Sequence, residues 1–401
     1  MSAFVYDIPT KVYFGENQLG HLGEELARYG SKVLVCYGGG SIKKSGLFDK
    51  VTAEIEKAGL TYFELSGIKP NPRVESVNRG AKICRKEGID VILAVGGGSV
   101  IDCAKFTAAA AFYDGDAWDI MTMKFKPTKA LPVLDISTLS ATGSDMDAGG
   151  VISNPDTKDK IGFSIPGLLQ PKVSFLDPTL TYSVGKYQTA CGSADILSHI
   201  IESYFVPPDG SMYMLDKVKE GLMKTVMKYA PIALTEPDNY EARANLQWAA
   251  SWAINGLTGA LQNCAWSCHP MEHELSAIYD ITHGLGLAIL TPRWMQYVLD
   301  ETTVNRFYEY GVNVFHIDPS LPQMDVAKKS IEKTEEFLYE TLGLKSTFKE
   351  IGIDDTNFAI MAEKACQGTV LSGFKPLAQV DIEKFLPCVS KACNAQRAAM
   401  I

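Results

Sequence analysis

Residues 90–111 read DVILAVGGGSVIDCAKFTAAAA and predict a strand, a glycine-rich turn and a helix. The β-branched and aliphatic run at 90–95 is typical of a strand buried on both faces, and the small apolar residues at 100–111 favour a helix. Backbone N–H groups of such a turn can bind a pyrophosphate next to the helix N-terminus. A turn with a purely structural role explains a single GGGS stretch equally well.

Two further stretches repeat this plan. Residues 32–37 (KVLVCY) form a predicted strand that ends in another GGGS turn at 38–41, the first of the two in chain order, before a helix predicted at 47–58. Residues 130–136 predict another strand, which runs into the polar stretch 137–144. Such repeats predict a doubly wound parallel sheet, with ligands bound at the carboxyl ends of its strands. Neither turn matches G-x-G-x-x-G, so we expect a Rossmann-like α/β domain rather than an ordinary Rossmann domain.

The pattern changes near residue 180. From there on, apolar residues recur at helical spacing over long segments, which lie at 185–205, 212–230, 240–263, 270–279, 284–299, 302–313 and 324–342. The length of 401 residues allows two or three domains. We expect a dinucleotide-binding α/β domain at 1–181 and an all-helical metal-binding and substrate domain at 182–401.

The composition excludes several classes of partner. The chain has 38 Lys and Arg against 47 Asp and Glu, so nothing favours nucleic acid or an anionic membrane. The start has no cationic segment followed by an apolar run, and no apolar stretch reaches the roughly 20 residues that span a bilayer. The nine cysteines include no CxxC pair, which is typical of reduced thiols. We therefore expect a cytoplasmic protein without a disulfide framework.

The stretch GGGSIKK at 38–44 bears on the choice of cofactor. NAD-binding domains place an Asp or Glu near such a point to bind the ribose 2′-hydroxyl, and this stretch has neither. Ser41, Lys43 and Lys44 would instead accommodate a ribose 2′-phosphate. The sequence therefore predicts NADP(H), while solvated surface lysines are the alternative explanation of Lys43 and Lys44.

Two groups of residues predict a metal site. Asp195 and His199 lie four residues apart on one predicted helix, so their side chains face the same way. His269, His273 and His283 lie close together in the sequence, although the chain has only six histidines. Carboxylates and imidazoles are common ligands of divalent metals, so convergence of the two groups would form a metal site. Structural histidines with satisfied hydrogen bonds are the alternative.

The same histidines allow a different interpretation. Residues 269–273 read HPMEH, which matches the H-x-x-E-H pattern of inverzincin metallopeptidases, with Glu272 as the general base. That interpretation leaves both GGGS turns and the Asp195/His199 pair unexplained.

Together these motifs resemble those of the iron-containing (group III) alcohol dehydrogenases over nearly the whole chain. The resemblance is carried by PTKVYFG at 9–15, GGGSVIDCAK at 96–105, TLSATGSD at 138–145, the Asp195-x-x-x-His199 pair and the histidines at 269, 273 and 283. The GGGSIKK turn is most similar to the NADPH-dependent butanol dehydrogenase and aldehyde reductase branch. The family implies an N-terminal dinucleotide-binding domain, an all-helical C-terminal domain and an active site in the cleft between them.

The resemblance also implies roles for individual residues. Asp195, His199, His269 and His283 would bind the metal, with Fe²⁺ expected first and Zn²⁺ next, and His273 would relay a proton as the catalytic residue. The cofactor would contact a larger set: Gly38, Gly39, Ser41, Lys43, Asn71, Gly97, Gly98, Ser99, Asp102, Thr138, Leu139, Thr142 and Lys160. The family further implies a homodimer.

The reaction that the resemblance implies is hydride transfer between NADP(H) and small aliphatic aldehydes or primary alcohols, such as butanal and butanol. A polyol dehydrogenase acting on glycerol or propanediol is an alternative within the same fold. A lyase of the dehydroquinate synthase type and a non-catalytic binding module are alternatives of other classes. Several side chains are candidates for the substrate pocket: Trp252, Trp266, Cys268, Tyr279 and Phe374.

Overall fold

The computed structural model describes residues 4–207, 212–259 and 266–390. The chain forms two compact units. The sheet unit comprises Tyr6–Val184 and Asp238–Gly256, and the helical unit comprises Met1–Val5, Gly185–Pro237 and Leu257–Ile401. The segment Asp238–Gly256 therefore belongs to the sheet unit, although a large part of the helical unit precedes it in the sequence.

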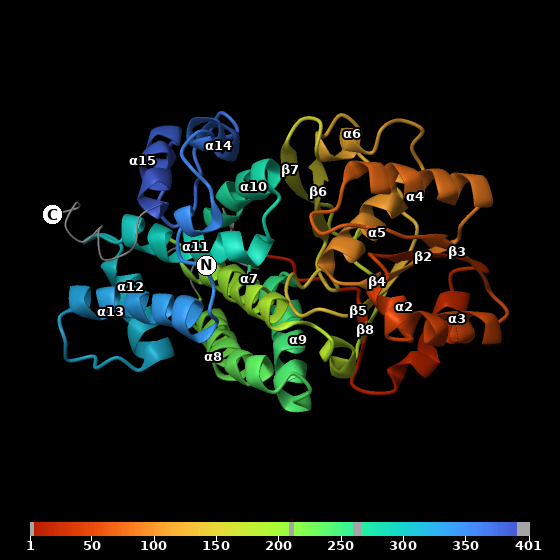
Figure 1. Cartoon of the computed structure of the whole chain (residues 1–401), viewed down its shortest axis with the longest axis horizontal. Helices are drawn as coiled ribbons and strands as arrows, with labels where there is room; N and C mark the ends of the chain where they lie inside the picture. The colour runs from red at the N-terminus through yellow and green to blue at the C-terminus, as the bar shows by residue number, and fades with distance from the viewer. Residues whose placement is uncertain (1–3, 208–211, 260–265, 391–401) are drawn as a thin grey trace. The chain divides into compact units, whose positions relative to one another are not determined.

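A six-stranded parallel sheet forms the centre of the sheet unit, with the strand order β1-β8-β5-β4-β2-β3 (Figure 1). Strands β6 and β7 form a separate antiparallel pair. The strands are β1 (Lys11–Phe14), β2 (Lys32–Tyr37), β3 (Thr61–Leu65), β4 (Val91–Gly96), β5 (Val133–Ser137), β6 (Gly149–Asn154), β7 (Asp159–Ser164) and β8 (Val173–Leu176). The helices of this unit are α1 (Leu22–Ala27), α2 (Ser41–Lys44), α3 (Leu47–Lys57), α4 (Val74–Glu87), α5 (Gly98–Ala110), α6 (Trp118–Met121) and α9 (Tyr240–Ile254).

Apolar side chains cover both faces of this sheet. On β2, Val33 and Val35 enter a core shared with α1 and α3, whereas Leu34 and Cys36 enter a core shared with α4 and α5. In Figure 1, α3 accordingly lies on one side of the sheet and α4 on the other. Burial on both faces explains why these strands read as continuous apolar runs rather than as alternating ones.

The strands predicted at 32–37 and 90–95 are confirmed as β2 and β4, and the helix predicted at 47–58 is confirmed as α3. The third predicted strand begins at Val133 rather than at 130. Leu131 and Pro132 do not extend the strand, because Leu131 N donates to Ala108 O at 3.1 Å and Pro132 has no N–H to donate.

The helical unit consists of α7 (Lys186–Tyr204), α8 (Tyr213–Thr235), α10 (Cys268–Tyr279), α11 (His283–Val298), α12 (Val304–Phe315), α13 (Gln323–Glu335), α14 (Phe358–Cys366) and α15 (Gln379–Val389). The helix predicted at 324–342 is α13 followed by a π-helical turn at Glu336–Thr341. The helix predicted at 240–263 ends at Ile254, and its positions 260–263 lie outside the described residues.

Two expectations about the whole chain concern membranes and thiols. Among the described helices, none is long and apolar enough to cross a membrane. The cysteines for which the structure gives a position are free thiols, and all but Cys388 are buried.

Candidate metal centre and cofactor site

The predicted metal ligands lie together in the helical unit. Asp195 and His199 lie on α7, His269 lies on α10, and His283 is the first residue of α11. The ligand atoms of Asp195, His199 and His269 all lie within 4.8 Å of one another. His283 Nε2 lies 3.7 Å from Asp195 Oδ1, and the rings of His269 and His283 are 5.3 Å apart. The structure therefore brings all four residues together.

Buried nitrogen atoms in this cluster suit a metal ion. His199 Nδ1 and His269 Nε2 are buried, and neither is hydrogen-bonded to any residue that the structure describes. Burial and the neighbouring imidazoles of His269 and His283 hold the pKa of His199 well below its usual value, so its ring is neutral and keeps a lone pair for a metal. Three imidazoles and one carboxylate fit Fe²⁺ or Zn²⁺.

Close packing of α11 against α7 places His283 at the cluster. Gly284 follows His283, and a Cβ atom at Gly284 would lie only 2.0 Å from the carbonyl oxygen of Cys191 on α7. Only a residue without a side chain therefore allows this approach. Since Cys191 lies one helical turn before Asp195, the contact sets His283 beside the ligands that α7 carries.

Glu202, which the sequence motifs did not single out, holds His269 in place. Its buried carboxylate contacts His269 Nδ1 and accepts hydrogen bonds from the backbone N–H groups of Ser267 at 2.6 Å and Cys268 at 2.8 Å. A hydrogen bond at Nδ1 puts the ring proton there and leaves Nε2 to bind a metal. Helical spacing could have found Glu202, because it lies three residues after His199 on the same helix.

Glu272 acts on His283 in the corresponding way. Its fully buried carboxylate contacts His283 Nδ1 and accepts a hydrogen bond from Ser276 Oγ. The other ring nitrogen of His283 then faces Asp195. Because Glu272 is engaged in orienting an imidazole, the geometry argues against the general-base role that the metallopeptidase interpretation gave it.

His273 and Trp266 lie next to the ligands. The ring of His273 is partly exposed and lies 5.8 Å from that of His283 and 6.4 Å from that of His269. Trp266 packs edge-on against the rings of His199 at 5.7 Å and His269 at 4.7 Å. Trp266 therefore presents an indole surface at the cluster, and its role in a substrate pocket stays a prediction.

The other candidates for the substrate pocket are placed differently. Cys268 is fully buried, the Tyr279 hydroxyl accepts a hydrogen bond from Asn357 at 3.0 Å, and Phe374 packs among core aromatic rings. Trp252 lies on α9 in the sheet unit. These four side chains have structural contacts that account for their positions.

In the sheet unit, the second GGGS turn joins β4 to α5 and packs against residues 138–142. A Cβ atom at Gly98 would lie 2.1 Å from Thr142 Oγ1, and one at Gly97 would lie 3.2 Å from Leu139. Thr138 N donates to the carbonyl oxygen at the end of β4 at 3.0 Å. The structure therefore brings together the predicted phosphate-binding turn and the predicted groove residues.

Asp102 lies on α5, three residues after Ser99 of the turn. Its buried carboxylate accepts hydrogen bonds from Ser144 Oγ at 2.5 Å and from Val151 N at 2.8 Å. Burial raises the pKa of Asp102 to about 6, although the nearby Lys105 ammonium opposes the rise. Asp102 therefore already links α5 to β6 through its hydrogen bond from Val151 N, and a contact with a ribose would be a second role.

Asn71 and Lys160 are brought close together by β6. Ser153 of β6 pairs with Lys160 of β7, and Ser153 N donates to Pro72 O at 2.8 Å. Both Asn71 and Lys160 are buried. The two residues were predicted as cofactor contacts from separate stretches, and they lie on either side of one strand.

The first GGGS turn has a carboxylate beside it. Lys43 Nζ lies 2.9 Å from Glu64 Oε2, and the Tyr37 hydroxyl also donates to that oxygen. Glu64 belongs to β3, the strand next to β2, so the residues around the turn do not reveal it. Gly39 and Ser41 are exposed at the turn. The stretch 38–44 contains no carboxylate, as the NADP(H) prediction stated, but the folded sheet brings the carboxylate of Glu64 beside Lys43.

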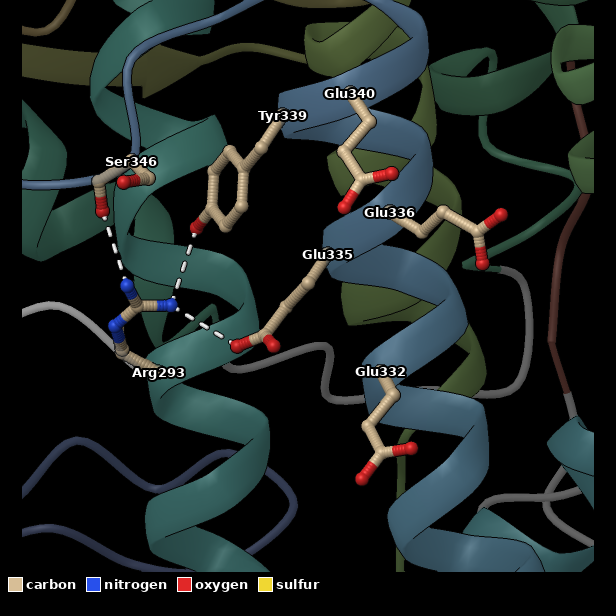
Figure 2. Close-up of a pocket in the computed structure, with 7 residues that line it drawn as sticks. All are labelled: Arg293, Glu332, Glu335, Glu336, Tyr339, Glu340 and Ser346. Atoms are coloured by element: carbon tan, nitrogen blue, oxygen red, sulfur yellow. Dashed lines mark hydrogen bonds and ion pairs between the residues drawn. The ribbon is translucent and has the colours of Figure 1, made fainter. Parts of the chain in front are cut away.

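A separate pocket of 460 Å³ lies among acidic side chains of the helical unit (Figure 2). The buried guanidinium of Arg293 on α11 donates to Glu335 Oε1 at 3.0 Å and to Ser346 O at 3.1 Å, and Figure 2 shows it also bonded to Tyr339. The described residues that line the pocket include no predicted site residue. They are Arg293, Glu332, Glu335, Glu336, Tyr339, Glu340 and Ser346. These bonds make the pocket a junction between α11 and α13.

A glycine-turn α/β unit and a helical unit that gathers one carboxylate and three imidazoles are together the features of a metal-dependent, dinucleotide-linked oxidoreductase. The family model for iron-containing alcohol dehydrogenase matches residues 9–178, and that for the C-terminal part of the Fe-containing alcohol dehydrogenase family matches residues 189–388. The chain belongs to the iron-containing alcohol dehydrogenase family, and it is an oxidoreductase that acts on alcohols.

Relatives with stated activities cover nearly all of the chain. NADH-dependent butanol dehydrogenase A of Clostridium acetobutylicum is 48% identical over 384 residues, which are 95% of this chain and 98% of the relative. The NADPH-dependent aldehyde reductase YqhD of Escherichia coli is 36% identical over 91% of this chain and 93% of its own. The crystal structure of NADH-dependent butanol dehydrogenase A from Thermotoga maritima superposes with a TM-score of 0.92, at 38% identity, over 98% of this chain and 99% of that one.

Membership of this family confirms the resemblance and the fold class that the sequence predicted. An oxidoreductase of this family is neither a peptidase nor a lyase, so both of those alternatives are wrong. The family also implies a nicotinamide cofactor and a divalent metal, which the four converging ligands fit.

Proposed function

We propose that the protein interconverts small aliphatic aldehydes and primary alcohols of about the size of butanal and butanol. The observation that carries this proposal is the convergence of Asp195, His199, His269 and His283. Within this group, the buried atoms His199 Nδ1 and His269 Nε2 have no hydrogen bond to any described residue. The relatives named butanol dehydrogenase and aldehyde reductase support this substrate class. The indole of Trp266 beside the ligands favours an apolar substrate chain over a polyol.

In this proposal, Asp195, His199, His269 and His283 hold the metal, with Fe²⁺ expected first and Zn²⁺ next. Such a metal would supply Lewis acidity to the substrate oxygen. Glu202 and Glu272 keep the rings of His269 and His283 in ligating orientation through their Nδ1 atoms.

His273 is the proposed proton carrier. Its ring lies within 6.4 Å of two ligand rings and is partly exposed, so it can exchange a proton with solvent. In alcohol oxidation a ring nitrogen of His273 would take up the proton of the substrate hydroxyl, and in aldehyde reduction it would return one. His273→Ala should therefore lower turnover about 100-fold or more while leaving metal and cofactor binding intact.

The sheet unit is the proposed dinucleotide site. Gly97, Gly98 and Ser99 would hold the pyrophosphate, and the packed stretch 138–142 would line the groove. A nicotinamide cofactor would supply or accept the hydride. The sequence of the first turn supports NADP(H), whereas Glu64 beside it and two relatives named NADH-dependent support NAD(H).

Polyol oxidation is the second candidate, because relatives named 1,3-propanediol dehydrogenase are 28% identical over about 90% of the chain. A polyol enzyme would oxidise glycerol or propanediol faster than butanol. The homodimer and the cytoplasmic location stay predictions from the sequence.

The test is the absorbance at 340 nm with butanal and either NADH or NADPH, on protein stripped with chelator and then reloaded separately with Fe²⁺ or Zn²⁺. Metal-dependent oxidation of either cofactor with butanal would support the proposal, and the comparison ranks the cofactors. Oxidation of propanediol without any reaction of butanol would favour the polyol candidate. Equal rates before and after chelation would contradict the metal role.

A further inference from the structure

Three polar side chains meet beside the first GGGS turn and form what we call the turn triad: Tyr37, Lys43 and Glu64. Tyr37 is the last residue of β2 and directly precedes the turn, and Lys43 lies on α2, which follows it. Glu64 on β3 is in register with Val35 of β2, so its side chain lies alongside the carboxyl end of that strand. The Glu64 carboxylate accepts hydrogen bonds from both other members of the triad.

The space over this turn is open to a ligand. A Cβ atom at Gly39 or Gly40 would meet no heavy atom within 4 Å. Parallel sheets bind their ligands at the carboxyl ends of the strands, where this turn lies. The side chains of Lys43 and Glu64 are 46% and 37% exposed, so both can reach a group that binds there.

The charge state of the triad favours a hydroxyl over a phosphate. The hydrogen bonds from Tyr37 and Lys43 lower the pKa of Glu64, so its carboxylate is ionised at neutral pH. A ribose 2′-phosphate would bring further negative charge next to this carboxylate, and Lys43 would have to divide its charge between the two anions. A ribose 2′-hydroxyl carries no charge and can donate a hydrogen bond to Glu64.

We propose that Glu64 is a specificity-determining residue that favours a cofactor with a free ribose 2′-hydroxyl, NAD(H), over NADP(H). The inference rests on the proposed dinucleotide site, and it takes the opposite direction to the preference predicted from the sequence of the turn. Glu64 supplies from a neighbouring strand the carboxylate that the turn itself lacks. Lys43, when released from Glu64, becomes the group that binds a 2′-phosphate.

The test measures binding rather than turnover, with ADP-ribose and 2′-phospho-ADP-ribose as the two probes in isothermal titration calorimetry. The wild type should bind ADP-ribose more tightly. Glu64→Gln keeps the size of the side chain and removes its charge, so it should raise the relative affinity for the 2′-phosphate about tenfold or more. Adding Lys43→Met to that variant should abolish the gain.

Glu54→Gln is the matched control, because Glu54 also forms an ion pair with a lysine, Lys57 at 3.2 Å, on α3 of the same unit. It should leave the affinity ratio unchanged. An equal change of both affinities in Glu64→Gln, or the same shift in the control, would overturn the inference. Failure of the wild type to bind either probe would overturn the dinucleotide site itself, whereas a shifted ratio without butanal reduction would overturn only the proposed substrate.

Discussion

Glu202 and Glu272 orient the proposed metal ligands and are not themselves proposed to bind the metal. Each is buried and contacts the Nδ1 atom of one ligand imidazole. Glu202 is itself held by the three backbone N–H groups of Ser267, Cys268 and His269 at the start of α10, so it fixes the helix end and the ring together. A ring turned about its Cβ–Cγ bond would lose this contact, so the ligating geometry is the favoured one.

Glu202→Gln should weaken metal binding about 10- to 100-fold, because the amide is a poorer partner for the Nδ1 proton of His269. The measurement is a competition titration between the protein and a chelator of known affinity. Glu274→Gln is a suitable control, since Glu274 lies on α10, the helix that carries His269, and pairs instead with Lys364 at 3.7 Å. Equal losses in the two variants, or unchanged affinity in Glu202→Gln, would show that the contact does not orient the ring.

The ligands and their orienting residues differ in how far sequence could reveal them. Asp195 and His199 could be predicted because helical spacing alone puts them on one face. Glu202 lies on the same helix and was within reach of the same argument. Glu64 could not be predicted in this way, because it comes close to Lys43 only through the pairing of β2 with β3. Strand order is a property of the folded sheet that local patterns do not contain.

The approach of α11 to α7 is the contact between elements on which the proposed metal centre depends. The start of α11 comes so close to α7 that the backbone of Cys191 occupies the space where a side chain of residue 284 would lie. Protein interiors are closely packed and adjust only slightly to added atoms. The distance between α11 and α7 is therefore set by this contact.

Gly284→Ala should lower the free energy of unfolding by about 1–3 kcal/mol and also weaken metal binding, because the added methyl group must push His283 away from Asp195. Urea unfolding and the chelator competition would measure the two effects. Gly221→Ala is the control for the general effect of replacing a helical glycine. Residue 221 is exposed on α8, and an added Cβ would have nothing within 4 Å. That variant should gain about 0.5–1 kcal/mol from the lower helix propensity of glycine.

Periodicity predicted several of the long elements, but it missed the helices α4 and α15 as well as short strands. The helices α7, α8, α10 and α11 and the strands β2 and β4 have clear apolar patterns, and each was predicted near its observed bounds. Strands β6 and β7 were not predicted, because GGVISN and DKIGFS contain glycine and polar residues at strand positions. A tertiary contact supports β6 instead, the hydrogen bond from Val151 N to the buried Asp102.

At the scale of the whole molecule, the sheet unit contains a group of buried acids. Asp102, Asp135 and Asp145 are all buried, and burial raises the pKa of each. The fully buried Lys105 ammonium binds Ser144 at 3.0 Å and also contacts Asp147. The stability of the unit should therefore depend on pH through groups that lie far from solvent.

Burial raises the pKa of Asp145 to about 6, against the opposing hydrogen bond from Ser251 and the charge of Lys105. Between about pH 4 and pH 6 the folded chain holds a proton on Asp145 that the unfolded chain has released, so raising the pH in this range destabilises the fold. Asp145→Asn removes the titrating group and with it this pH-dependent loss of stability. The free energy of unfolding of the wild type, relative to the variant, should fall by about 2–3 kcal/mol from pH 4 to pH 6.5. A difference that stays constant with pH in urea titrations would contradict the prediction.

The membership of α9 in the sheet unit has a consequence for how the protein is made. Residues 238–256 supply partners to buried polar groups, since Ser251 donates to Asp145 and Gln247 donates to Ser137 O at 3.3 Å. A ribosome releases these residues only after Gly185–Pro237 of the other unit. At roughly 5–20 residues per second, that delay lasts about 3–11 s. During this interval the nascent sheet unit exposes acids that α9 later covers, and we expect the growing chain to bind chaperones most strongly then.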